Sequence, residues 1–253
     1  MQRILIACAA LALACGGAKE QLSRGQAAEN PATPATAPTR AGGATITGSV
    51  KFTGAVPANP RIDMTEEPAC KAKYATAPTD PIVVVNHGAL ASVFVYVKSG
   101  LPGGQKYAAP TTPVQIDQRG CLYHPRVLGV MVDQPFEILN NDPILHNIKA
   151  VPRVNRGFNI SQPQQGMHTT RTFNVPEMPV PLECNVHGWM HGKVFVMDHP
   201  FFAVSDSTGA FTLRGLPAGT YTLEAWHEKL GTQTATVTVT PQGAATTVFT
   251  FAG

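Results

Sequence analysis

The stretch Cys184-Asn185-Val186-His187-Gly188-Trp189-Met190 decides how the fold of this chain is interpreted. It places a thiol, an imidazole and a thioether within one short segment. Upstream of it, the turn-rich segment Asn140-Asn141-Asp142-Pro143-Ile144-Leu145-His146 ends in a second imidazole. The chain therefore offers several donors that favour the same class of metal.

His146, Cys184, His187 and Met190 form the candidate metal site. A trigonal His, Cys, His set with a weak axial Met is an arrangement that binds copper in electron-transfer sites. The thioether suits the axial position because it is neutral, polarizable and weakly binding. The expected cofactor is therefore copper.

The order of these donors, His followed by Cys-x2-His-x2-Met, resembles the cupredoxins, and the short loop from Cys184 to Met190 resembles the amicyanin type. The resemblance covers roughly residues 113–198. It implies a Greek-key β-sandwich and one-electron exchange with a redox protein partner. It also implies that Asn147 hydrogen-bonds across to the Cys-bearing loop and thereby orients the ligands.

The ligand loop departs from that family in two ways. Cupredoxins usually carry Pro directly before the second His, where this chain has Val186, and His191 directly follows Met190. His191 and Glu183 therefore remain alternatives to Met190 as the axial ligand. Either of them would coordinate the metal more rigidly, favour Cu(II) and lower the reduction potential.

A rival metal site uses Cys121-Leu122-Tyr123-His124, which repeats the Cys-x2-His spacing of Cys184 and His187. Together the two pairs would make a Cys2His2 set for structural zinc. That set requires Cys70 to be unpaired, which an oxidising compartment disfavours. A thiol-enzyme dyad of Cys184 and His187 is disfavoured as well, because no oxyanion-donor motif is evident.

The N-terminus is typical of an exported protein. Residues 1–14 have a positively charged start and an apolar run that is too short to span a bilayer, as in a signal peptide. Leu11-Ala12-Leu13-Ala14-Cys15 resembles a bacterial lipobox, which implies that Cys15 carries a lipid. Ordinary cleavage without a lipid is the alternative. Residues 15–43, rich in Ala, Pro and Thr, are expected to form a disordered tether. We expect a periplasmic or outer-membrane-anchored lipoprotein that contacts the membrane through its N-terminal lipid.

The cysteines divide by their expected fates. Removal of Cys8 with the signal peptide and lipidation of Cys15 leave Cys70, Cys121 and Cys184. In an oxidising compartment, two of these three should pair. Cys70 and Cys121 are the expected disulfide if the metal holds Cys184. An exported free thiol without a metal would be open to oxidation.

The composition is that of a turn-rich all-β protein. The chain has 23 Gly and 22 Pro residues, only 14% of its residues are charged and its net charge is +3. These values give no basis for nucleic-acid binding. Period-two or β-branched runs predict strands at residues 45–52, 91–98, 221–226 and 234–240. Helix is expected to be minor.

The last quarter of the chain carries a second resemblance. Residues 206–213 (DSTGAFTL) and 215–223 (GLPAGTYTL) resemble a carboxypeptidase regulatory-like domain of transthyretin-like fold. Residues 199–253 alone offer too few strands for a sandwich. Residues 44–112 are therefore predicted to complete this sandwich, with a copper module at 113–198 inserted between its halves. Two modules in series are the alternative.

These observations predict an exported copper protein that transfers single electrons and is not an enzyme. His187 is the expected electron port at the surface, Cys184 the conduit and His146 the buried donor. Trp189 is expected either to pack inside or to form part of an apolar docking patch. A copper delivery or storage protein and a non-redox cell-surface binding module are the alternatives. No small-molecule substrate is identified.

Overall fold

The computed structural model describes residues 42–253, which form an almost entirely β-structure with one short helix, α1 (Pro68–Lys71). The predicted all-β class with minor helix is confirmed. Within this range no helix is long and apolar enough to cross a membrane. The predicted signal peptide, the lipidation site Cys15 and nearly all of the tether lie outside the described residues.

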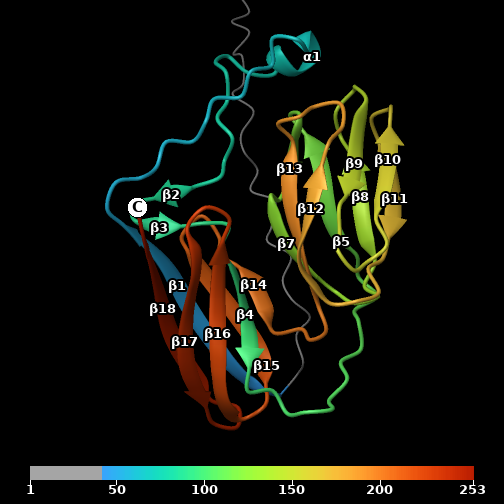
Figure 1. The fold of residues 1–253 in the computed structure, drawn as a ribbon. Helices are drawn as coiled ribbons and strands as arrows, with labels where there is room; N and C mark the ends of the chain where they lie inside the picture. Colours follow the sequence, from blue (N-terminus) through green and yellow to red (C-terminus); the bar gives the residue numbers. More distant parts are fainter. Residues whose placement is uncertain (1–41) are drawn as a thin grey trace, which may run out of the picture. The chain divides into compact units, whose positions relative to one another are not determined.

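Strands from both ends of the described range build one sandwich, here called the terminal sandwich, where Figure 1 shows blue and teal strands beside red ones. One of its sheets has the order β15-β1-β3-β2 with β18 also paired to β1, and the other has the order β14-β4-β16-β17. The strands are β1 (Ala44–Thr53), β2 (Val85–Asn86), β3 (Ala89–Leu90), β4 (Phe94–Ser99), β14 (Phe202–Val204), β15 (Ala210–Leu216), β16 (Gly219–His227), β17 (Gly231–Val239) and β18 (Ala244–Ala252).

Alternation of apolar and polar side chains explains these strands. Along β1 the residues Ile46, Val50 and Phe52 are buried in the terminal core, and their neighbours point toward solvent. The strand predicted at 91–98 begins three residues later, at Phe94. The reason is local, because Ser92 has a φ of 61°, which is incompatible with an extended strand.

The remaining strands build a second sandwich, the central sandwich, coloured green to orange in Figure 1. Its sheets have the orders β10-β9-β12-β13-β7 and β11-β8-β5-β6, and the two parallel pairs β5/β8 and β7/β13 interrupt the antiparallel pattern. The strands are β5 (Val114–Arg119), β6 (Leu122–His124), β7 (Val127–Met131), β8 (Phe136–Asn140), β9 (His146–Ala150), β10 (Phe158–Gln162), β11 (Met167–Arg171), β12 (Glu177–Glu183) and β13 (His191–Met197).

Chain connectivity links the two sandwiches twice. The strands β1 and β4 precede the central sandwich in sequence, and β14 to β18 follow it, yet the two groups pair within the same sheets. The segments on both sides of the central sandwich therefore contribute to one terminal core. The domain boundaries that we expected from the sequence stay predictions.

Candidate metal centre

Two neighbouring strands bring the candidate ligands together. His146 is the first residue of β9, and Cys184 directly follows the last residue of β12. The two strands are antiparallel, with Glu183 paired to Lys149, so the start of one lies beside the end of the other. His187 lies in the turn that joins β12 to β13.

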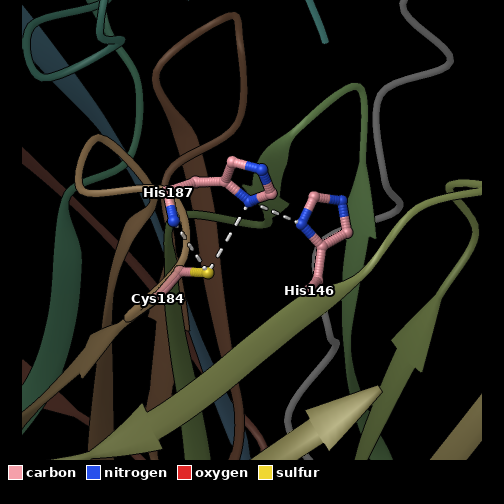
Figure 2. A group of neighbouring side chains, drawn as sticks. All are labelled: His146, Cys184 and His187. Carbon is pink, nitrogen blue, oxygen red and sulfur yellow. Dashed lines mark hydrogen bonds between the residues drawn. The ribbon is translucent and has the colours of Figure 1, made fainter. Parts of the chain in front are cut away.

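Three donor atoms converge at this edge of the sheet, as Figure 2 shows. The Nδ1 atoms of His146 and His187 are 3.0 Å apart, and the Sγ atom of Cys184 is 3.8 Å from Nδ1 of His187. All three atoms lie within 4.8 Å of one another. The three residues are at most 5% exposed, so water is largely excluded from the space between them.

The ligand loop is a compact turn with its own hydrogen bonds. The backbone N–H of His187 donates to Cys184 Sγ at 3.4 Å, and that of Met190 donates to the His187 carbonyl at 2.9 Å. The N–H of Cys184 donates in turn to the Met190 carbonyl at 3.2 Å. Met190 is fully buried and belongs to the same apolar cluster as Cys184.

Asn147 connects the two ligand-bearing segments. Its Oδ1 accepts the backbone N–H of Asn185 at 3.0 Å, next to Cys184. Its own carbonyl accepts the hydroxyl of Tyr123 at 2.6 Å. The side chain of Asn147 therefore accepts a hydrogen bond from the Cys-bearing loop.

The electrostatics of the site favour a thiolate. Burial alone would raise the pKa of Cys184, but hydrogen bonds from His146 and His187 and from backbone amides lower that pKa to about 5. Burial acts to lower the pKa of His146, and hydrogen bonds to Asp142 and Cys184 outweigh it and raise that pKa. A thiolate is the form of Cys that binds metals.

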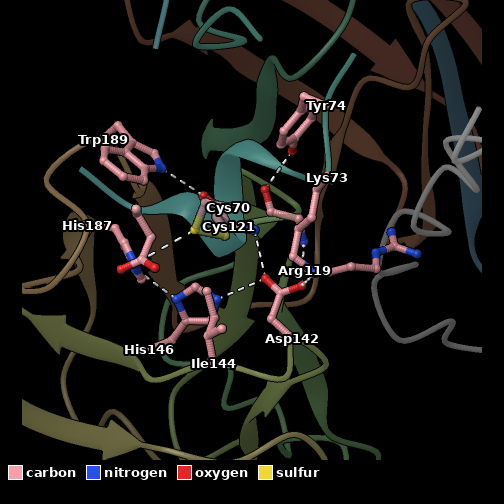
Figure 3. The surroundings of a disulfide bond; sticks show 12 residues. Cys70, Lys73, Tyr74, Arg119, Cys121, Asp142, Ile144, His146, His187 and Trp189 are labelled. Atoms are coloured by element: carbon pink, nitrogen blue, oxygen red, sulfur yellow. Dashed lines mark hydrogen bonds and ion pairs between the residues drawn. A yellow bond between two sulfur atoms is a disulfide. The ribbon is translucent and has the colours of Figure 1, made fainter. Parts of the chain in front are cut away.

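A cap covers the second histidine, and we define it as residues 62–74, which include α1. Its Cys70 forms a disulfide with Cys121, and the Sγ atom of Cys70 lies 3.8 Å from Nε2 of His187. Glu67 Oε2 lies 3.6 Å from the same nitrogen. Figure 3 shows the disulfide between His187 and the short helix.

The expectation that His187 emerges at the surface is therefore wrong, because its side chain is only 1% exposed beneath the cap. Trp189 is partly buried and donates its indole N–H to the Cys121 carbonyl at 3.0 Å. Of the two roles considered for Trp189, packing is the one that this contact describes.

Asp142 is a site residue that sequence reasoning missed. Its carboxylate is 1% exposed, and Oδ2 lies 2.9 Å from Nε2 of His146. It also accepts the backbone N–H groups of Gly120 and Cys121, and it pairs with Lys73 of the cap at 2.8 Å. These interactions hold the pKa of Asp142 well below its usual range despite its burial, which acts in the opposite direction.

The alternative ligands lie elsewhere. Among residues 42–253, neither His191 nor Glu183 belongs to the group of three converging donors, and Glu183 Oε2 lies 3.6 Å from Lys149 Nζ. Cys121 is in the disulfide and therefore supplies no thiolate to the rival zinc set. The Nε2 atom of His124 lies 3.1 Å from the Arg119 carbonyl.

Comparison with known proteins gives three findings. Residues 194–252 match the family model of the carboxypeptidase regulatory-like domain, which confirms the second resemblance for that part of the chain. A search of the curated proteins finds no match. Solved structures with partial similarity include cupredoxins.

The Cu-containing nitrite reductase from Thermus scotoductus SA-01 is 22% identical with a TM-score of 0.31, over 40% of this chain and 26% of that chain. A purple cupredoxin from Nitrosopumilus maritimus is 22% identical with a TM-score of 0.29, over 33% of this chain and 98% of that chain. An oxidized amicyanin variant is 21% identical with a TM-score of 0.31, over 41% of this chain and 98% of that chain.

Proposed function

We propose that the chain binds one copper ion at His146, Cys184 and His187 and that it transfers single electrons. The observation that carries this proposal is the convergence of two imidazole nitrogens and one thiol sulfur within 4.8 Å in a buried space. Two imidazoles and a thiolate suit copper in both of its common oxidation states. When bound, copper supplies the Cu(II)/Cu(I) couple.

Met190 is proposed as a fourth, weaker donor. Its complete burial beside Cys184 and the hydrogen bonds that close the turn support this assignment. A thioether is a soft, neutral donor and would hold copper more weakly than the imidazoles and the thiolate. The rival Cys2His2 zinc set is disfavoured, because it needs a thiolate from Cys121 and Cys121 is in the disulfide.

The residues around the donors would keep the site rigid during electron transfer. Asn147 ties the β9 segment to the ligand loop, and Asp142 holds the ring of His146. Neighbours of this kind orient ligands and tune a metal. Because the donors are already assembled without a metal, these residues would need to move little when a bound copper changes its oxidation state.

The cap favours retention of the metal over its delivery. A delivery protein needs an exposed donor that can be passed to a partner, whereas His187 is covered by the disulfide and by Glu67. We therefore propose that an exported redox protein exchanges electrons with this site and that no substrate is transformed. The disulfide supports an oxidising compartment, and lipid anchoring through Cys15 remains part of the proposal.

The test is to add Cu(II) to the purified protein and to record its visible spectrum. We expect an intense thiolate-to-copper band at one copper per chain. The variant Cys184→Ala should lose the band, and His168→Ala, which changes an exposed His on the opposite sheet, should keep it. A colourless protein, or a band that survives Cys184→Ala, would contradict the proposal.

A further inference from the structure

We infer that Asp142 is a positioning residue that keeps hydrogen on Nε2 of His146, aims Nδ1 at the other donors and lowers the reduction potential of the site. The predicted effect on the reduction potential rests on the proposed function. The positioning of the His146 ring does not, because it can be measured in the protein without metal.

The geometry around the Asp142 carboxylate supports the placement of hydrogen on Nε2 of His146. An ionised carboxylate only accepts hydrogen bonds, and Asp142 Oδ2 lies 2.9 Å from Nε2 of His146. That nitrogen must therefore carry the hydrogen. The lone pair of Nδ1 then points into the space shared with His187 and Cys184, which is the form that a metal needs.

The carboxylate is itself held firmly. Both of its oxygens are used: Oδ2 accepts the N–H of Cys121 at 2.7 Å, and Oδ1 accepts the N–H of Gly120 at 3.0 Å and lies 2.8 Å from Lys73 Nζ. These donors come from the hairpin between β5 and β6 and from the cap. Figure 3 shows them converging on Asp142 beside His146. A buried carboxylate with this many donors stays ionised and fixed in place.

The negative charge of Asp142 is the reason for the predicted effect on the reduction potential. A negative charge one imidazole away from the metal favours Cu(II), which carries one more positive charge than Cu(I). The effect is strong because Asp142 and His146 are both nearly inaccessible to water. Lys73, whose side chain is 28% exposed, opposes the carboxylate in part. Removal of either charge should therefore shift the potential, and the two shifts should have opposite signs.

The first experiment uses metal-free protein labelled with ¹⁵N and measures the His146 ring nitrogens at a pH where the ring is neutral. Wild type should show hydrogen on Nε2 and none on Nδ1, and Asp142→Ala should show a mixture of the two tautomers. Hydrogen on Nδ1 in wild type, or an unchanged tautomer in Asp142→Ala, would overturn the positioning role. This outcome does not depend on copper.

The second experiment measures the reduction potential of the copper-loaded protein. Asp142→Asn keeps the shape of the side chain, and we expect at least a tenfold fall in the ratio of Cu(II) to Cu(I) affinity, which is a rise of about 59 mV. Lys73→Met should lower the potential and keeps the inference testable if Asp142→Asn does not fold. The charge effect would be overturned if both folded variants shifted the reduction potential in the same direction, or if neither variant shifted it.

Asp206→Asn is the matched control. Asp206 also accepts two backbone N–H groups, from Thr208 at 2.8 Å and Ala210 at 3.0 Å, but it lies at the β14–β15 turn of the terminal sandwich. We expect no change in the potential or in the His146 tautomer. If wild type lacks the thiolate-to-copper band, the proposed function fails, and the tautomer measurement still decides the role of Asp142.

Discussion

Replacement of both Cys70 and Cys121 by Ala tests the cap most directly. The disulfide joins residues that are 51 positions apart, and the chain-entropy model gives about 4 kcal/mol for closing a loop of this length. We expect the free energy of unfolding of the metal-free protein to fall by about this amount in urea denaturation. Because about 1.4 kcal/mol corresponds to a tenfold change in an equilibrium, the open form of the cap should become up to about a thousandfold more populated.

That opening has a functional consequence for His187, since the cap covers it. We expect the double variant to give up Cu(I) to a strong chelator much faster than wild type does, and we expect its Cu(II) form to keep the visible band. The assay follows the absorbance of the chelator complex over time, at equal protein and chelator concentrations. The salt bridge from Lys73 to Asp142 survives the substitution, but a noncovalent contact does not restrict the unfolded chain as the cross-link does.

Tyr74→Phe is the control for this experiment. It removes a hydrogen bond of 2.6 Å from the cap to the Gly120 carbonyl but keeps the disulfide, so we expect a loss of about 1 kcal/mol and little change in copper release. The reasoning is refuted if the double variant stays within about 1 kcal/mol of wild type. It is refuted as well if copper release is unchanged, because the cap would then not control access to His187.

Three further predictions concern other parts of the fold. Burial lowers the pKa of His227 to about 4 from its ordinary 6.5, so the ring stays neutral in the folded state above that pH. The unfolded state takes up the proton first, so stability should fall as the pH drops from about 6.5 to 4. His227→Gln should remove up to about 3 kcal/mol of that pH dependence in urea denaturation. Tyr123→Phe removes the buried hydroxyl that donates to the Asn147 carbonyl at 2.6 Å, and it should cost about 1–2 kcal/mol in the same assay. Gly48→Ala places a Cβ 2.2 Å from the Phe211 ring and 2.7 Å from the Thr247 carbonyl oxygen, and it should lower the free energy of unfolding by at least about 1 kcal/mol. An unchanged urea midpoint would contradict the close packing of β1 between β15 and β18.

The sequence predicted the strands with clear alternation, but it did not specify how strands distant along the chain pair with one another. The runs at 221–226 and 234–240 lie within β16 and across β17, because a period of two is a local property. The parallel pairing of β1 with β18 joins segments at opposite ends of the described chain. Nothing in either segment alone specifies that partner, since register is set by burial and by the geometry of the connections.

The residues of the candidate site also differ in how far local sequence predicts them. The spacing of Cys184 and His187 was visible because both lie in one turn. Asp142 was not, because an Asp before Pro is an ordinary turn residue and its partners come from three separate segments. The burial of His187 was missed for the same reason. Its cover comes from Glu67 and Cys70, more than a hundred positions upstream, and no local pattern links the two.

The charges of the site explain why these distant partners belong to it. Hydrogen bonds from His146 and His187 favour the thiolate form of Cys184, and the buried Asp142 carboxylate pairs with Lys73 of the cap. His146, His187 and Cys184 would hold a copper ion only with their lone pairs free, so copper affinity would depend on pH. Cu(II) would bring one more positive charge than Cu(I), and Glu67, 3.6 Å from Nε2 of His187, is a further carboxylate that the cap places beside the site. The cap is therefore part of the electrostatics of the site and more than a cover over it.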